Sequence, residues 1–275
     1  MQILLTNDDG IHAPGLAALR DAVADLGETV VVAPDIERSG VAHSITLAHP
    51  LRIRKVYRDD TLFGYGVNGA PADCVKLGCD QILGDRPDLL LSGINLGPNA
   101  AINILYSGTV AGAIEGAVLG IPSVALSLAE VDEPNFPQAA AVARELIERL
   151  APDALDPRTV LNVNIPGLPR TDIRGVRVTH QSRTGYDDYY DRRTDPWGRD
   201  YYWITGELQR HFEHEPDSDL RALRDGYVSI TPLHFDLTDY EALPALRERL
   251  AGEWTAGKAG RRHGGRETSG EGGRG

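Results

Sequence analysis

Two adjacent carboxylates, Asp8 and Asp9, follow the short apolar run at residues 2–6. Like charges this close raise the pKa of one partner unless a cation lies between them. A hard divalent cation such as Mg²⁺ or Mn²⁺ removes that repulsion, and it prefers oxygen ligands. The pair is therefore a candidate metal site, and an Asp-Asp-Gly turn that only caps a helix is the alternative.

Neutral oxygen donors that suit such a site occur at two later strand ends. Ser39 lies in the loop after the second predicted strand, and Asn95 follows the third predicted parallel strand. The carboxyl ends of parallel strands meet at one edge of a sheet, where α/β proteins bind their ligands. We therefore expect Asp8, Asp9, Ser39 and Asn95 to converge there and to hold one divalent metal ion per subunit.

A second candidate site is the helix start at Ser107-Gly108-Thr109. The first turn of a helix offers unpaired backbone N–H groups and the positive end of the helix dipole. Two hydroxyls lie beside it, and a glycine lets an anion approach the backbone. The segment therefore predicts a phosphate site, with a plain serine N-cap as the alternative.

Alternating strand and helix patterns place these loops. Apolar runs and period-two alternation predict strands, and apolar residues at helical spacing predict helices. Strands are expected at residues 2–6, 29–33, 51–57, 61–67, 88–91, 121–126, 159–164, 174–180 and 226–231, and helices at 14–26, 71–83, 107–119, 137–150 and 240–254. Repeated strand–helix units predict an α/β fold with a mostly parallel sheet flanked by helices.

The segment at residues 181–225 interrupts this rhythm with polar, charged and aromatic residues, among them Trp197 and Trp203. A structureless stretch of this length is unusual inside a compact domain. We interpret it as a protruding arm whose aromatic side chains pack against another subunit, with packing on its own domain as the alternative. One domain is expected over residues 1–254, and the Gly-rich tail at 255–275 is expected to be disordered.

Composition disfavours several classes of protein. The 275 residues include 28 Lys and Arg against 40 Asp and Glu, and the net charge of −12 disfavours binding to a nucleic-acid backbone. No apolar run reaches the roughly 18 residues of a transmembrane helix. Two cysteines, Cys74 and Cys79, are too few for a disulfide scaffold. With no leader-like N-terminus, we expect a cytoplasmic protein with no membrane and no stable nucleic-acid partner.

Common catalytic motifs of other enzyme classes are missing from the sequence. It has no Gly-x-Gly-x-x-Gly after the first strand, no P-loop and no Gly-x-Ser-x-Gly elbow, which disfavours dinucleotide oxidoreductases, P-loop NTPases and α/β-hydrolases. A phosphatase that forms an aspartyl-phosphate usually has Asp-x-Asp, whereas Asp8 and Asp9 are adjacent. His12 and His43 lie in the candidate loops, either as phosphate or proton contacts or as ordinary loop histidines.

Several long motifs, in order along the chain, resemble the SurE family (survival protein E). They are Ile3-Leu4-Leu5-Thr6-Asn7-Asp8-Asp9-Gly10 with the residues to 15, and the stretches 33–40, 67–75, 92–99, 106–111, 162–166 and 225–233. The resemblance reaches to about residue 254 and does not include the Gly-rich tail. It implies a Rossmann-like core and a swapped C-terminal arm in a homodimer or homotetramer.

The resemblance also implies 5′/3′-nucleotidase activity and assigns site residues. The metal ligands of the family map onto Asp8, Asp9, Ser39 and Asn95. Its phosphate-binding residues map onto Asn99, Ser107, Gly108 and Thr109.

The sequence and its resemblance together predict a metal-dependent phosphomonoesterase. We expect it to hydrolyse nucleoside 5′- and 3′-monophosphates with a water activated by Mg²⁺ or Mn²⁺. Asp8 and Asp9 are the expected catalytic residues, and Asp9 also orients or deprotonates the water. The alternative is a metal-dependent sensor that binds nucleotides without turnover.

Overall fold

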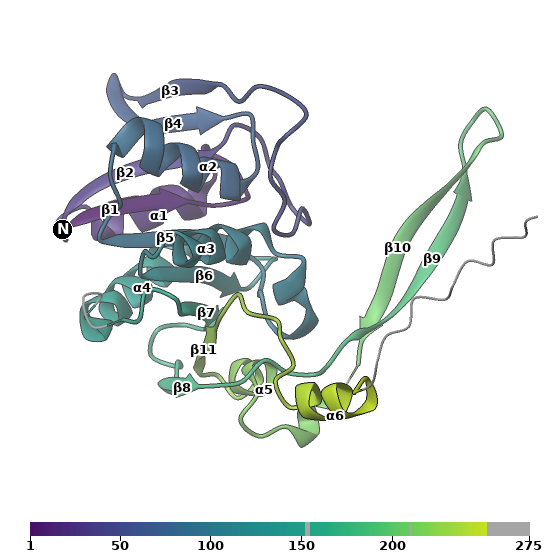
Figure 1. Cartoon of the computed structure of the whole chain (residues 1–275). Helices are drawn as coiled ribbons and strands as arrows, with labels where there is room; N and C mark the ends of the chain where they lie inside the picture. The colour runs from purple at the N-terminus through teal and green to yellow at the C-terminus, as the bar shows by residue number, and fades with distance from the viewer. Residues whose placement is uncertain (152–154, 210, 252–275) are drawn as a thin grey trace, which may run out of the picture. The chain divides into compact units, whose positions relative to one another are not determined.

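Nine strands form the sheet that carries the candidate loops, in the order β3-β4-β2-β1-β5-β6-β7-β11-β8 (Figure 1). Neighbours run parallel except β3 against β4 and β7 against β11. The strand bounds are β1 Gln2–Thr6, β2 Glu28–Pro34, β3 Ile53–Arg58, β4 Thr61–Val67, β5 Leu89–Leu96, β6 Ser123–Ala129, β7 Val160–Pro166, β8 Val176–Val178 and β11 Val228–Leu233. The expected α/β class with a mostly parallel sheet is confirmed.

The computed structural model describes residues 1–151, 155–209 and 211–251. Its contacts divide the chain into two units, residues 1–235 and 236–275. In the second unit, α6 (Ala242–Arg249) falls within the helix expected at residues 240–254. The single domain expected over residues 1–254 stays a prediction, and the tail expected from residue 255 lies outside the described residues. Within the described part of the chain, every helix is too short or too polar to cross a membrane.

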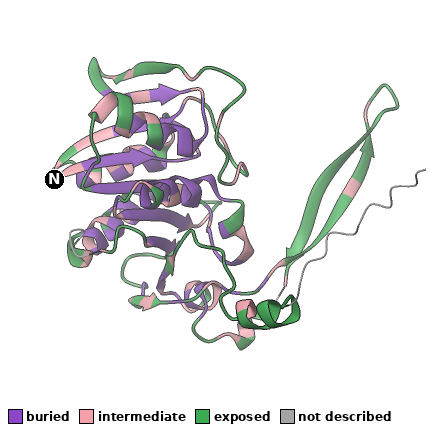
Figure 2. Cartoon of the chain, viewed as in Figure 1, coloured by how far each residue is buried: buried purple, intermediate pink, exposed green. Residues whose placement is uncertain are grey.

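Helices cover both faces of the sheet. Side chains alternate along each strand, so each strand contributes to the core on both faces. Ile3 and Leu5 lie in a core cluster with α1 (Pro14–Val23) and α4 (Phe136–Leu150). Leu4, between them, lies in the opposite cluster with α2 (Pro71–Leu77) and α3 (Gly108–Val118). Burial on both faces explains why these strands are continuous apolar runs, and Figure 2 shows the sheet centre as buried.

The strand expected at residues 88–91 is longer in the structure and ends at Leu96. The sequence pattern ended the strand at residue 91 because polar residues and a glycine follow there. Gly93 makes the continuation possible, since a Cβ at that position would lie 2.3 Å from the carbonyl oxygen of Leu126 on the neighbouring strand. Its φ of 140° also suits only glycine. Other helical segments include η1 (Gly78–Leu83), which continues α2, and η2 (Ala101–Leu105).

The expected arm contains a two-stranded antiparallel hairpin, β9 (Tyr186–Thr194) and β10 (Asp200–Leu208). All of its strand residues are exposed except half-buried Asp191, as Figure 2 shows. Isolated two-stranded hairpins are marginally stable in water, and packing of the aromatic side chains against another subunit stays a prediction. The rest of residues 181–225 forms η4 (His211–His214) and α5 (Asp219–Arg224).

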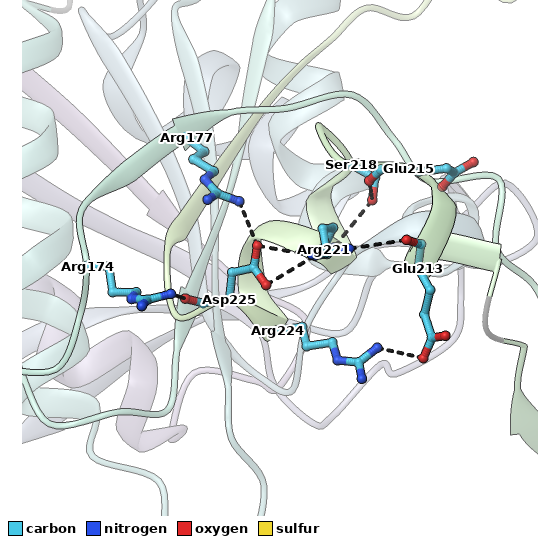
Figure 3. Close-up of polar contacts among 8 residues, drawn as sticks. All are labelled: Arg174, Arg177, Glu213, Glu215, Ser218, Arg221, Arg224 and Asp225. Atoms are coloured by element: carbon cyan, nitrogen blue, oxygen red, sulfur yellow. Dashed lines mark hydrogen bonds and ion pairs between the residues drawn. The ribbon is translucent and has the colours of Figure 1, made fainter.

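Ion pairs and hydrogen bonds hold α5 in place (Figure 3). Asp225 accepts hydrogen bonds from Arg177 of β8 at 2.9 Å and from Arg221 of α5 at 3.1 Å. Arg224 pairs with Glu213 of η4 at 2.7 Å. The short helix is thus tied to the edge of the large sheet and to the chain that leaves the hairpin.

Candidate functional site

Five of the predicted site residues line one pocket at the carboxyl ends of β1 and β5. The pocket has a volume of about 340 Å³, and its lining includes Asp8, Ser39, Asn95, Asn99 and Ser107. Asp8, Ser39 and Asn99 come from the loops after β1, β2 and β5, Asn95 from the end of β5, and Ser107 from the N-cap of α3. The parallel strand order brings the loops to one edge of the sheet, where the sequence predicts the site.

Asp8 is buried and lies against the start of α3, with 4% of its surface exposed. The Thr109 hydroxyl donates a hydrogen bond to its carboxylate, and the N–H groups of Gly108 and Thr109 add further hydrogen bonds. Burial raises the pKa of Asp8, and these donors offset part of the rise. The positive end of the helix dipole therefore faces a carboxylate that has lost much of its water.

Asp9 is partly buried next to this first carboxylate. Burial and the charge of Asp8 together raise the pKa of Asp9 to about 7, although the Leu96 N–H hydrogen-bonds its carboxylate and lowers the pKa. Glu37 adds a smaller repulsive contribution. The site therefore concentrates negative charge that a cation would neutralise.

Ser39 reaches the pocket on a loop that is anchored at several points. Its hydroxyl donates to Glu37 at 2.6 Å, so the lone pairs of Ser39 Oγ remain as acceptors. The Arg38 N–H donates to the Asp8 carbonyl at 2.7 Å, and the Ala42 N–H donates to the Tyr106 carbonyl at 3.1 Å. The loop is thereby tied to both sides of the pocket.

The same loop is anchored outside the pocket by Glu115, a buried residue of α3 that the sequence reasoning did not single out. Its carboxylate contacts His43 Nε2 at 2.8 Å and Lys76 Nζ at 2.5 Å. Burial raises the pKa of Glu115, but the hydrogen bonds from His43 and Lys76 outweigh it and lower the pKa overall. His43 therefore lies in a loop anchor, and the pocket lining does not include it.

Asn95 sits where the pairing of β5 with β6 shifts register, between Ser92 and Asn95. Irregularities of this kind redirect side chains near functional sites. The Asn95 amide nitrogen donates to the carbonyls of Leu96 at 3.1 Å and Gly97 at 2.7 Å. The side-chain oxygen of Asn95, Oδ1, is the kind of ligand that a hard cation prefers.

Asn99 is held by the sheet behind it. Its N–H donates to Asn164 Oδ1 at 2.8 Å, and its carbonyl accepts from Asn162 at 2.8 Å. Its own amide nitrogen donates to Ser127 Oγ at 2.9 Å. Sequence reasoning assigned no role to Asn162 and Asn164, although two amides at alternate positions of an otherwise apolar strand place both on one face and were the available signal.

The predicted phosphate-binding segment divides in the structure. Ser107 lines the pocket and caps α3, its hydroxyl accepting from the Val110 N–H at 3.0 Å. Thr109 is fully buried, and its hydroxyl points to Asp8. Ser107 is therefore the helix N-cap that the alternative describes. Its hydroxyl still carries a proton that it can donate, so the cap does not exclude a contact with phosphate.

The donor set of the pocket suits a hard divalent cation. Among the described residues, no three His, Cys, Asp or Glu side chains are grouped closely enough to hold a metal by themselves. Two carboxylates, a hydroxyl and an amide oxygen are instead the oxygen donors that Mg²⁺ or Mn²⁺ prefers, with room for further ligands. The roles of Asp8, Asp9, Ser39 and Asn95 as ligands stay predictions.

Comparisons with known proteins agree over most of the chain. The family model described as "Survival protein SurE" matches residues 3–188. A "5'-nucleotidase SurE" of Desulforudis audaxviator (strain MP104C) is 50% identical over 253 residues, covering 90% of this chain and 97% of the relative. Another, of Heliobacterium modesticaldum (strain ATCC 51547 / Ice1), is 45% identical over 257 residues, covering 92% and 93%. The crystal structure of the SurE protein from Aquifex aeolicus is similar with a TM-score of 0.80 at 43% identity, covering 90% of this chain and 99% of that one.

Proposed function

Since the chain belongs to the SurE family, we propose that it is a metal-dependent 5′-nucleotidase that hydrolyses nucleoside monophosphates to nucleoside and phosphate. The observation that carries this proposal is the pair of desolvated carboxylates, Asp8 and Asp9, beside a pocket that ends at a helix N-terminus. One end of the pocket suits a cation and the other suits an anion. Nucleoside 3′-monophosphates are proposed as a second group of substrates.

Asp8, Asp9, Ser39 and Asn95 would hold one divalent cation, Mg²⁺ or Mn²⁺. Their oxygens match the preference of a hard cation, and the charge of the cation would relieve the repulsion that raises the pKa of Asp9. When bound, the cation would polarise the phosphoryl group and make water more acidic. Thr109 would keep the Asp8 carboxylate in its orientation.

Asp9 is the proposed group that orients or deprotonates the attacking water. It is the carboxylate next to Asp8 at the proposed cation, where it would hydrogen-bond a water and accept its proton. Its carboxylate is less buried than that of Asp8, so water has access to it. The two neighbouring carboxylates would therefore differ in role, because their environments differ.

Asn99 and Ser107 would bind the phosphate oxygens. The N–H groups of Gly108 and Thr109, which the sequence also places at the phosphate, hydrogen-bond the Asp8 carboxylate and would hold it in place. The Ser107 hydroxyl accepts within its own helix and has its proton left to donate. Preorganised donors of this kind stabilise charge as the phosphoryl group is transferred. The Thr109 hydroxyl is assigned to Asp8 instead, since its hydrogen bond is directed there.

A homodimer or homotetramer formed through the hairpin is proposed for the assembly. Tyr190, Trp203 and Ile204 on the hairpin are each about 60% exposed, at 67%, 59% and 62%. Aromatic and aliphatic side chains on a thin two-stranded sheet gain most from burial against another copy.

The test is phosphate release from a panel of 5′- and 3′-mononucleotides by EDTA-treated protein, with Mg²⁺ or Mn²⁺ added back. Release that depends on the added metal supports the proposed activity, and the rates across the panel order the substrates. An Asp9→Asn preparation, purified in the same way, controls for contaminating phosphatases. If the protein binds nucleotides but releases no phosphate with any metal, the sensor alternative replaces the proposal.

A further inference from the structure

One wall of the pocket is hydrogen-bonded to the segments that flank the hairpin. The wall is the segment 99–107, which contributes Asn99, Asn103, Tyr106 and Ser107 to the pocket lining. Its Ala101 N–H donates to Asp219 Oδ2 at 2.8 Å, and Gln181 donates to the Ala101 carbonyl at 2.8 Å. Two residues that flank the hairpin in sequence therefore hold one residue of the pocket wall from both sides.

The hairpin itself reaches the wall through Tyr186, the first residue of β9. The Asn103 amide nitrogen donates to the Tyr186 hydroxyl at 3.0 Å. The Asn103 carbonyl accepts from the N–H groups of Tyr106 and Ser107, each at 3.1 Å. Asn103 thus connects two elements: its side chain contacts the hairpin, and its backbone contacts the start of α3.

Asp219 makes the attachment rigid. It is fully buried, and besides Ala101 it accepts from the N–H groups of Ser182 at 3.0 Å and Leu220 at 2.7 Å. The other end of α5 is fixed through Asp225 and its arginine partners, which Figure 3 shows. The segments that flank the hairpin are therefore fixed relative to the sheet. Tyr186, the first residue of β9, is positioned by them.

The two ends of the wall have different anchors. Asn99 is held by Asn162, Asn164 and Ser127 of the central sheet. Asn103 takes its side-chain partner from the hairpin. Loss of the Tyr186 hydroxyl would therefore release the Asn103 side chain while Asn99 and the metal-facing residues stay in place.

We propose that Tyr186 is a positioning residue for the nucleoside part of the substrate, acting through its hydrogen bond to Asn103. This inference rests on the proposed nucleotidase function, which assigns the phosphate to Asn99 and Ser107. Asn103 lines the same pocket, and its side chain hydrogen-bonds Tyr186 of the hairpin. The side chain that Tyr186 orients is a planar amide with donors and an acceptor, which suits the hydroxyls of a ribose or the edge of a base.

The test compares Tyr186→Phe with Tyr189→Phe, a matched control on the same strand that is 60% exposed. Loss of one neutral hydrogen bond corresponds to roughly a three- to tenfold effect. Tyr186→Phe should raise KM for 5′-mononucleotides by that factor, with kcat, oligomeric mass and KM for β-glycerol phosphate unchanged. Tyr189→Phe should match the wild-type protein throughout.

Hydrogen exchange provides a readout that does not depend on turnover. Amides in residues 101–107 should exchange faster in Tyr186→Phe and at the wild-type rate in Tyr189→Phe. An unchanged nucleotide KM in Tyr186→Phe, or an equal rise for β-glycerol phosphate, would overturn the positioning role. If the wild-type protein releases no phosphate, the proposed function fails separately, and the nucleotide dissociation constant then replaces KM in the same comparison.

Discussion

A Cβ atom placed on Gly108 would lie 2.7 Å from the Cβ of Asp8 and 2.9 Å from its Oδ2. Side-chain carbons do not approach this closely, so the first residue of α3 has to be a glycine if Asp8 is to keep its place. The first residue of α3 and the carboxylate after β1 therefore determine each other's position. The Thr109 hydroxyl completes this arrangement from the next residue of the helix.

Gly108→Ala is expected to displace Asp8 and to weaken binding of Mn²⁺ by about tenfold or more. Overpacking usually costs about 1–3 kcal/mol, and the better helix propensity of alanine returns up to about 1 kcal/mol, so the free energy of unfolding should fall by at most about 3 kcal/mol. Calorimetric titration with Mn²⁺ and thermal unfolding measure the two effects separately. Gly112→Ala is the control, since a Cβ there meets Ser92 and Thr6 and not Asp8. Equal Mn²⁺ affinity in both variants would contradict the role given to Gly108.

Asp9→Asn is expected to lower turnover of 5′-mononucleotides by at least about 100-fold, the usual contribution of a positioned general base. The fold should persist, because the substitution removes a charge that Asp8 repels. Steady-state kinetics with saturating metal and a thermal unfolding curve check both points. Asp21→Asn, at a carboxylate that is 75% exposed, should leave the kinetics unchanged. Near-normal rates for Asp9→Asn would remove Asp9 from the mechanism.

Glu115→Gln is expected to make stability less dependent on acid pH. Burial raises the pKa of Glu115, but His43 and Lys76 outweigh it and hold the pKa below its ordinary value of 4.5. The stabilisation is therefore complete above about pH 5 and is lost as pH falls through the lowered pKa.

The loss at neutral pH should be about 1–2 kcal/mol, less than for a fully buried pair, because His43 and Lys76 are 36% and 46% exposed. Urea unfolding at pH 7 and near pH 3.5 should show a difference between Glu115→Gln and the wild-type protein that shrinks in acid. Glu148→Gln, which breaks an exposed pair with Arg144, is the control. A difference that is independent of pH would assign the effect to packing.

Trp203→Ser is expected to shift the protein toward a single chain of 29.8 kDa, because it removes a large exposed aromatic surface from β10. Light scattering over a range of protein concentrations measures the mass. Leu47→Ser, at an 87% exposed residue outside the hairpin, should leave the mass unchanged. A wild-type protein that is monomeric at every concentration would contradict assembly through the hairpin.

The sequence by itself determined the α/β class, most strands and helices, and the loops that meet at one sheet edge. These follow from local patterns: apolar runs for buried strands, helical spacing for helices, and polar residues where each strand ends. Asp8, Ser39, Asn95, Asn99 and Ser107 were therefore expected together, and they line one pocket. The ligand and catalytic roles assigned to them stay predictions.

Only the tertiary structure decided which partner each polar side chain takes. Thr109 was expected at the phosphate, and its hydroxyl instead points to Asp8. Asp219 and Tyr186 were not expected near the pocket, yet they hold Ala101 and Asn103. Such pairings join residues about 80 to 120 positions apart in the chain. They depend on strand order and on the close approach of backbone at Gly93 and Gly108, which no local pattern of residues encodes.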